Sequence, residues 1–289
     1  MSVTLGLIGL GEAGLAIADG LRTEGVEVHG YDVRAGDPAV AERIREAGVV
    51  PRASTADLAG TCDVLIGLTT ASTAKAVVGD LEDSLRPRHV FTDWNSGSPG
   101  LKRELAGMVS RTGARFADGA VMGAVPPARH RVPVLLSGDG AEALAATVEG
   151  LGFNLEVIGP EPGQASAVKM MRSLLIKGLE ALLLEFVAGA DRYGITERVL
   201  GSMDGALPVH DWGELASYLL TRSYTHGARR AEELRQVAAT LASSGVEPVV
   251  ASAGATRLQW LVDLGLDRSS PPPAHYRDVL ELIKEAQAR

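Results

Sequence analysis

The 289-residue sequence contains a single cysteine, Cys62, and aromatic residues make up only 4% of it. One cysteine cannot form an intramolecular disulfide, and the chain has no HExxH or CxxC spacing. The sequence therefore predicts neither a disulfide framework nor a metal centre. We expect a protein of the reducing cytoplasm, in which Cys62 has no redox role.

Basic residues are in the minority, because 28 Lys and Arg stand against 36 Asp and Glu, for a net charge of -8. Binding to a phosphate backbone requires the opposite balance, so nucleic acid is not an expected partner. No charge-free run reaches membrane-spanning length, and no basic leader precedes the strand-like run that starts at Val3. The composition is that of a soluble protein long enough for two domains, and we expect no membrane partner.

Short β-type runs alternate with Ala-rich helical stretches as far as about Ile158, a pattern typical of a parallel sheet built from βαβ units. The expected strands are Val3–Ile8, Val26–Tyr31, Val64–Leu68, Val90–Asp93, Arg115–Phe116, Val134–Leu136 and Leu155–Ile158. One long helix is expected over Gly163–Tyr193, and the rest is helical with Gly, Ser and Pro breaks. We therefore predict an α/β fold with an N-terminal Rossmann doubly wound parallel sheet in residues 1–160, followed by an all-α domain in residues 161–289.

A glycine-rich motif joins the first expected strand to the first helix, and it consists of Gly9, Leu10, Gly11, Glu12, Ala13 and Gly14. In a dinucleotide fingerprint the first glycine allows a tight turn, the second lets the backbone approach the pyrophosphate, and the third lets helix and strand pack closely. The helix N-terminus then faces the phosphates. Because the second strand and an acid at its end follow where the fold needs them, the sequence predicts an NAD-type cofactor.

The acid at the end of the second strand is Asp32. A carboxylate there accepts hydrogen bonds from the adenosine ribose hydroxyls, which favours NAD over NADP. Arg34 lies two residues further on and leaves NADP possible, because an arginine can hold the 2′-phosphate. The alternative for Arg34 is a solvated loop cation.

Three further segments follow in chain order: Asp93–Pro99 (DWNSGSP), Asp118–Ala124 (DGAVMGA) and Gly159–Ser173 (GPEPGQASAVKMMRS). With the glycine motif, they resemble the motifs of the β-hydroxyacid dehydrogenases, a family that includes the 6-phosphogluconate-dehydrogenase-like oxidoreductases. The family patterns are D-x-S-T-x-x-P, D-A-P-V-S-G-G and G-x-x-G-x-G-x-x-x-K-x-x-x-N. The resemblance covers most of the chain and implies hydride transfer between nicotinamide and substrate.

The resemblance also implies roles for individual residues. Asn95 and Ser96 would lie beside the nicotinamide ribose, and Lys169 would be the catalytic lysine. Met122, Gly123 and Ala124 stand in the substrate-carboxylate loop, where Met122 replaces a serine and cannot hydrogen-bond a carboxylate in the same way. Ser173 replaces the family's asparagine, and the C-terminal residues look like those of a less characterised branch.

The residues themselves support a polar site on the long helix. Lys169, Ser173 and Lys177 are spaced i, i+4 and i+8, so they form one stripe on a helix otherwise rich in apolar residues. Only five of the 28 basic residues are lysines, and two of these lie on the stripe. A buried lysine can exchange protons near neutrality, and carbinol–carbonyl interconversion needs such a group. The alternative for Lys169 is a snorkelling cation, and for Lys177 a structural ion pair in place of a substrate contact.

Other polar residues are weaker candidates. Thr69, Thr70 and Ser96 are expected at the carboxyl ends of strands, where open α/β sheets hold ligands, or as helix caps. His226 either approaches the site from the helical domain or is simply exposed. We interpret Asp93 as a turn-forming acid. The segment Arg129–Arg131 is a cationic loop that either attracts an anionic substrate or is solvated.

The main hypothesis is an NAD-dependent dehydrogenase or reductase of a small polar hydroxyl or carbonyl compound. The alternatives are an NADPH-dependent reductase of ketones or imines and an inert NAD(P)-binding regulatory protein. We also expect a homodimer joined through the helical domain, because the long helix is apolar over more of its circumference than one neighbouring domain can cover.

Overall fold

The computed structural model describes residues 3–192, 194–203, 211–243, 247–266 and 271–289. The chain divides into two units by its internal contacts, Met1–Lys169 and Met170–Arg289. Each unit has hydrophobic clusters of its own.

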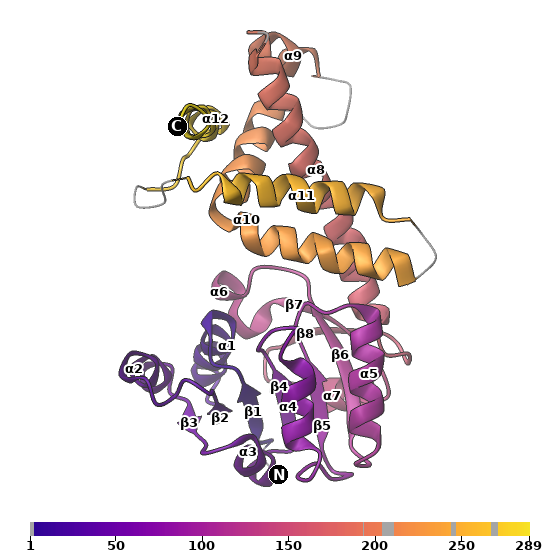
Figure 1. The fold of residues 1–289 in the computed structure, drawn as a ribbon. Coiled ribbons are helices and arrows are strands. Elements are labelled where there is room, and N and C mark those ends of the chain that lie inside the picture. The colour runs from indigo at the N-terminus through magenta and orange to yellow at the C-terminus, as the bar shows by residue number, and fades with distance from the viewer. Residues whose placement is uncertain (1–2, 193, 204–210, 244–246, 267–270) are drawn as a thin grey trace. The chain divides into compact units, whose positions relative to one another are not determined.

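An eight-stranded sheet with the order β3-β2-β1-β4-β5-β6-β7-β8 forms the centre of the first unit (Figure 1). Its strands are β1 (Leu5–Ile8), β2 (Val28–Tyr31), β3 (Val50–Pro51), β4 (Val64–Gly67), β5 (Val90–Asp93), β6 (Arg115–Val121), β7 (Pro133–Ser137) and β8 (Asn154–Gly159). The strand order reverses between β1 and β4, which is where such sheets bind ligands. The predicted α/β class is confirmed, but the sheet is only mostly parallel, because β7 runs antiparallel to β6. The short strand β3 was not predicted.

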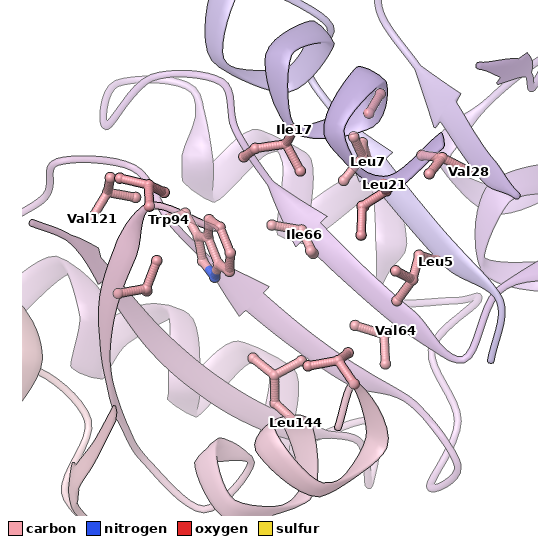
Figure 2. Packing of buried hydrophobic residues seen from close by; sticks show 14 of the residues in the cluster. Leu5, Leu7, Ile17, Leu21, Val28, Val64, Ile66, Trp94, Val121 and Leu144 are labelled. Atoms are coloured by element: carbon pink, nitrogen blue, oxygen red, sulfur yellow. The ribbon is translucent and has the colours of Figure 1, made fainter. Parts of the chain in front are cut away.

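Helices cover both faces of this sheet because its strands are apolar on both sides. One cluster joins Leu5, Leu7, Val64 and Ile66 to the helices α1 (Glu12–Thr23), α2 (Pro38–Glu46) and α7 (Ala141–Thr147), and Figure 2 shows part of it. The intervening residues Ile8, Leu65, Phe91 and Phe116 pack with α3 (Thr55–Thr61), α4 (Ala74–Leu81) and α5 (Pro99–Ser110) on the other face. This alternation leaves the carboxyl ends of the strands as the place where polar residues gather.

In the described residues of the second unit, all regular secondary structure is helical, as predicted. The long helix α8 (Gln164–Arg192) begins in the first unit and continues into the second, which also contains α9 (Thr196–Ser202), α10 (Trp212–Ser243), α11 (Val249–Asp263) and α12 (Tyr276–Gln287). α10 packs along α11 (Figure 1) and is kinked at His226, whose backbone is not helical (φ -122°, ψ 19°). None of the described helices combines the length and apolarity that crossing a membrane would require.

Candidate functional site

The turn between β1 and α1 has the geometry of a phosphate-binding loop. Gly9 has a positive φ of 96°, and a Cβ there would come within 2.7 Å of the Leu68 carbonyl oxygen. A Cβ on Gly14 would overlap the carbonyl oxygen of Gly9, so helix and strand can approach only because this residue is glycine. A Cβ on Gly11 would meet nothing within 4 Å. The packing of the fold therefore does not require glycine at position 11. A ligand that closely approaches this backbone would require it, because a Cβ would occupy the same space.

The start of α1 offers hydrogen-bond donors beside this open space. The first backbone N–H groups of a helix have no intrahelical partner, and the N-cap residue Gly11 provides no side-chain acceptor for them. Glu12 is exposed and Leu10 is buried beneath the turn. These features fit the pyrophosphate of a dinucleotide, which a helix N-terminus stabilises through its N–H groups and its dipole.

Asp32 is held next to the glycine turn. Its Oδ2 accepts a hydrogen bond of 2.8 Å from the backbone N–H of Leu10, and its Oδ1 accepts one of 2.8 Å from the N–H of Arg34. The Arg34 side chain is 67% exposed, with its Nε 3.8 Å from the carboxylate. The two residues that the sequence placed at the adenosine end of the cofactor are therefore neighbours.

The strand ends bring some of the predicted polar residues together. Thr69 follows β4 and Asn95 follows β5, and the Asn95 amide donates to the Thr69 hydroxyl (3.4 Å) and to Asp93 Oδ1 (2.5 Å). Ser96 is partly buried beside Asn95. Thr70 is exposed, and its hydroxyl is within 2.9 Å of the hydroxyls of Ser72 and Thr73, ahead of α4.

Asp93 is not the simple turn-forming acid that we expected. It is 1% exposed, and its carboxylate accepts a 2.6 Å hydrogen bond from Lys102 Nζ on α5. Sequence reasoning missed Lys102 altogether. The sequence did carry a signal. Lys102, Leu105 and Val109 follow one another at intervals of three and four residues, which places them on one buried face of α5. A lysine on such a face is almost never found without a partner.

The third motif is partly a strand. Residues 118–121 belong to β6, which is longer than predicted, and only Met122, Gly123 and Ala124 continue as a loop. The Met122 N–H donates to the Pro133 carbonyl (2.8 Å), while Gly123 and Ala124 are exposed. A Cβ on Gly119 would overlap the Trp94 ring, which explains glycine where the family motif has alanine.

The segment Arg129–Arg131 forms a 3-10 turn whose two arginine side chains remain 49% and 63% exposed. His130 is 2% exposed, and the flanking arginines pair with acids of the first helix and the turn after it: Arg129 with Asp19 (3.2 Å), and Arg131 with Glu24. The segment lies next to α1, and the two arginines are exposed ion-pair partners there.

Lys169, Ser173 and Lys177 all lie on α8. Lys169 is partly buried, one helical turn after Ser166. Lys177 Nζ donates to Ser173 Oγ (3.2 Å) and pairs with Glu233 of α10 (2.9 Å). Burial lowers the pKa of Lys177, and Glu233 opposes this shift. Lys177 is thus an ion-pair partner whose side chain keeps 14% exposure.

His226 is exposed at the kink of α10. Among the described residues, no cluster of three or more His, Cys, Asp or Glu side chains could hold a metal ion. Burial raises the pKa of the Cys62 thiol to about 12, so this cysteine stays protonated.

The model of the NAD binding domain of 6-phosphogluconate dehydrogenase matches residues 4–152, which is more than half of the chain. The chain belongs to this family. A nicotinamide dinucleotide as cofactor and the predicted resemblance are thereby confirmed. Residues 190–261 match a second family model, described as a domain of unknown function (DUF1932).

Several relatives of this NAD-binding family member cover much of its length. An L-threonate dehydrogenase of Cupriavidus necator is 30% identical over 205 residues, which are 68% of this chain and 67% of the relative. A conserved hypothetical protein of Sinorhizobium meliloti 1021 is 36% identical, with a TM-score of 0.82 over 99% of this chain and 97% of that one. A conserved protein of unknown function, described as structurally similar to 3-hydroxyacid dehydrogenases, is 33% identical, with a TM-score of 0.76 over 90% and 97%.

Proposed function

We propose that the protein is an NAD(P)-dependent dehydrogenase or reductase of a small polar hydroxyl or carbonyl compound, with Lys169 as general acid and base. The observation that carries the proposal is the way α8 begins. Asp93 is the last residue of β5 and the register partner of Asp118 within β6, and Asp118 binds both the N–H and the hydroxyl of Ser166. The helix turn that bears Lys169 therefore starts at the sheet edge where Thr69 and Asn95 also lie.

The nicotinamide, when bound, supplies or accepts the hydride at the substrate carbon. The protein must then move the hydroxyl proton and orient the substrate. Lys169 is our candidate for the proton transfer, because a lysine can donate a proton as the ammonium and accept one as the amine. We assign to Ser173, one turn further on, the orientation of a polar group of the substrate.

The substrate class follows from the departures in the substrate loop. A thioether at position 122 replaces a hydroxyl donor, so a carboxylate placed there would lose a hydrogen bond worth about 1–3 kcal/mol. We therefore expect short 3-hydroxy acids such as 3-hydroxyisobutyrate to be poor substrates. L-threonate, named for the Cupriavidus necator relative, is the first compound to assay, because it also carries a carboxylate and a 3-hydroxyl and so tests the argument from Met122 directly.

Two alternatives rest on particular residues. Arg34 beside Asp32 favours an NADPH-dependent ketone or imine reductase if its guanidinium holds the 2′-phosphate. Met122 and Ser173 are the departures that favour an inert NAD(P)-binding regulatory protein. Fluorescence titration with NADH and NADPH distinguishes the first alternative from the main proposal, for which we expect NADH to bind more tightly than NADPH. Turnover of any hydroxy acid, polyol or imine would exclude the inert regulatory protein.

The decisive variant is Lys169→Ala, assayed with the cofactor and substrate that the titration and the panel identify. We expect the NADH dissociation constant to stay near that of the wild type and kcat to fall by roughly two to four orders of magnitude, the scale of general acid–base assistance. The matched control is Lys75→Ala, which removes an exposed lysine of α4. Unchanged turnover in Lys169→Ala would reject the proposed role of this residue.

A further inference from the structure

A buried polar network lies at the carboxyl edge of the sheet, and sequence reasoning did not foresee it. Six side chains take part, each no more than 7% exposed: Asp93, Asn95, Lys102, Asp118, Ser137 and Ser166. They come from three neighbouring strands, the turn after β5, and the helices α5 and α8. Two of these groups, Asn95 and Ser166, adjoin the site proposed above.

Lys102 is the only cation of the network. Its Nζ lies 2.6 Å from both the carbonyl oxygen and Oδ2 of Asp93, and 3.3 Å from Oδ1 of Asp118. Burial alone would lower the pKa of Lys102, but the two carboxylates overcome that effect and raise it. The lysine therefore stays protonated and joins the end of β5 to the middle of β6 through their acids.

Asp118 connects this lysine to the first turn of α8. Its Oδ2 accepts from the Ser166 N–H (2.9 Å) and the Ser137 hydroxyl (3.4 Å), and its Oδ1 accepts from the Ser166 hydroxyl (2.7 Å). The Ala165 N–H donates to Ser137 Oγ (3.1 Å). Two carboxylates face one lysine, and the N-terminal end of α8, with its partial positive charge, offsets the remaining negative charge.

We propose that Lys102 is a positioning residue: through Asp118 it fixes the helix turn that leads to Lys169, and through Asp93 it fixes Asn95. This inference rests on the function proposed above, because it assigns to Lys102 the placement of two groups of that site. Lys102 itself is enclosed by the network and does not act on the substrate.

Stability alone does not account for such a network. Replacing a buried ion cluster by apolar side chains of similar volume is often neutral or stabilising, because the desolvation of the charges is avoided. Hydrogen bonds of fixed direction accomplish what apolar packing does not, since they define where the first turn of α8 begins relative to β5 and β6. A small misplacement of a catalytic group lowers the turnover rate, and a displacement of about 1 Å can lower it by roughly 100-fold.

The test uses two variants of the full chain and one control. Lys102→Met removes the cation at nearly constant volume, and Ser166→Ala removes one hydroxyl while the backbone contact to Asp118 remains. The control, Ser54→Ala, deletes the N-cap of α3, whose hydroxyl accepts from the Asp57 N–H. The measurements are kcat and KM, the NADH dissociation constant, and hydrogen–deuterium exchange in peptides covering residues 160–170.

For Ser166→Ala and for folded Lys102→Met, we expect kcat to fall by about tenfold or more with a smaller change in KM. The NADH dissociation constant should stay within about twofold, while amide exchange at the start of α8 becomes at least about tenfold faster. Ser54→Ala should change none of these quantities. If Lys102→Met does not fold, Ser166→Ala decides the matter.

Unchanged exchange at the start of α8 overturns the proposal, and so does faster exchange with unchanged kcat in an enzyme that Lys169→Ala inactivates. Failure of the proposed function looks different. In that case Lys169→Ala leaves turnover intact, whereas the exchange measurement still reports whether Lys102 fixes the helix.

Discussion

The three glycines of the β1–α1 turn have separable physical roles at the scale of single residues. We expect Gly14→Ala to destabilise the fold by about 1–3 kcal/mol or more, because its Cβ would overlap the carbonyl oxygen of Gly9. Gly11→Ala should leave the melting temperature almost unchanged, since Gly11 has an ordinary φ of -74° and open space around it. The same change should weaken NADH binding by about tenfold or more, because it pushes the pyrophosphate off the helix N–H groups.

Thermal denaturation and NADH fluorescence titration of the two variants check this division. Gly11→Ala that binds NADH like the wild type would place the pyrophosphate elsewhere than on this turn. Gly14→Ala with wild-type stability would contradict the packing of α1 on β1.

The buried His130 makes stability depend on pH. Neither ring nitrogen has a hydrogen-bond partner among the described residues, and the ring packs edge-on against Phe153. Burial lowers the pKa of His130, and Glu24 offsets only part of this shift. In the unfolded chain the imidazole takes up a proton near pH 6.5, whereas in the folded chain it does so only at lower pH. The free energy of unfolding therefore has its full value, as far as His130 is concerned, above about pH 6.5. It falls as the pH is lowered from there through the folded-state pKa of His130.

Urea denaturation between pH 7.5 and 5.5 measures this effect. His130→Asn should be less stable at pH 7.5, because it leaves a smaller side chain in the core, but its stability should fall less steeply on acidification. Burial also lowers the pKa values of His29 and His89, so part of the slope should remain. An unaltered slope in His130→Asn would show that His130 takes no part in it.

At the scale of elements, the sequence allowed most of the parallel strands and the long helix α8 to be predicted, because their apolar runs and periodicities are unambiguous. The antiparallel direction of β7 could not be predicted in this way, since a buried strand has the same apolar pattern in either direction. The extension of β6 through residues 118–121 was hidden by its Asp and Gly, which are typical of loops. Asp118 is tolerated in a buried strand only because Lys102, Ser137 and Ser166 satisfy it.

The candidate site shows the same division. The half of the site that would hold the cofactor is local in sequence, because the glycines and Asp32 belong to a single βαβ unit. This half was therefore predictable. The network around Lys102 joins residues up to 48 positions apart through side-chain contacts. Such contacts depend on tertiary packing, which no local pattern specifies.

Helices α8 and α10 are joined by a second buried ion pair, between Glu180 and Arg230. Both side chains are almost fully buried, so Arg230→Met should cost about 3–5 kcal/mol because it leaves the Glu180 carboxylate without its cation. The double variant Glu180→Leu with Arg230→Met should recover much of this loss. A double-mutant cycle measured by urea denaturation tests the coupling, and strictly additive costs would show that the two charges do not stabilise each other.

At the scale of the whole molecule, the exposed apolar side chains along one face of α8 bear on its assembly. Met171, Leu175 and Leu182 are 41%, 70% and 62% exposed, and their spacing of four and seven residues places them on one face of the helix. Large apolar side chains that stay exposed along one face are typical of an interface, and in homo-oligomers the two-fold dimer is the commonest arrangement. This surface supports our proposal of a homodimer joined through the helical unit.

Sedimentation at micromolar concentration tests the homodimer, since one chain has a mass of 30.1 kDa. We expect the wild type to sediment as a species of twice that mass, and Leu175→Glu with Leu182→Glu to sediment as a single chain, because charges placed in an apolar contact cannot be desolvated cheaply. The control is Val33→Glu, which changes an 84% exposed valine of the first unit and should leave assembly intact. A wild type found only as single chains would refute the homodimer. A dimer that survives both glutamates would instead place the interface on another surface of the protein.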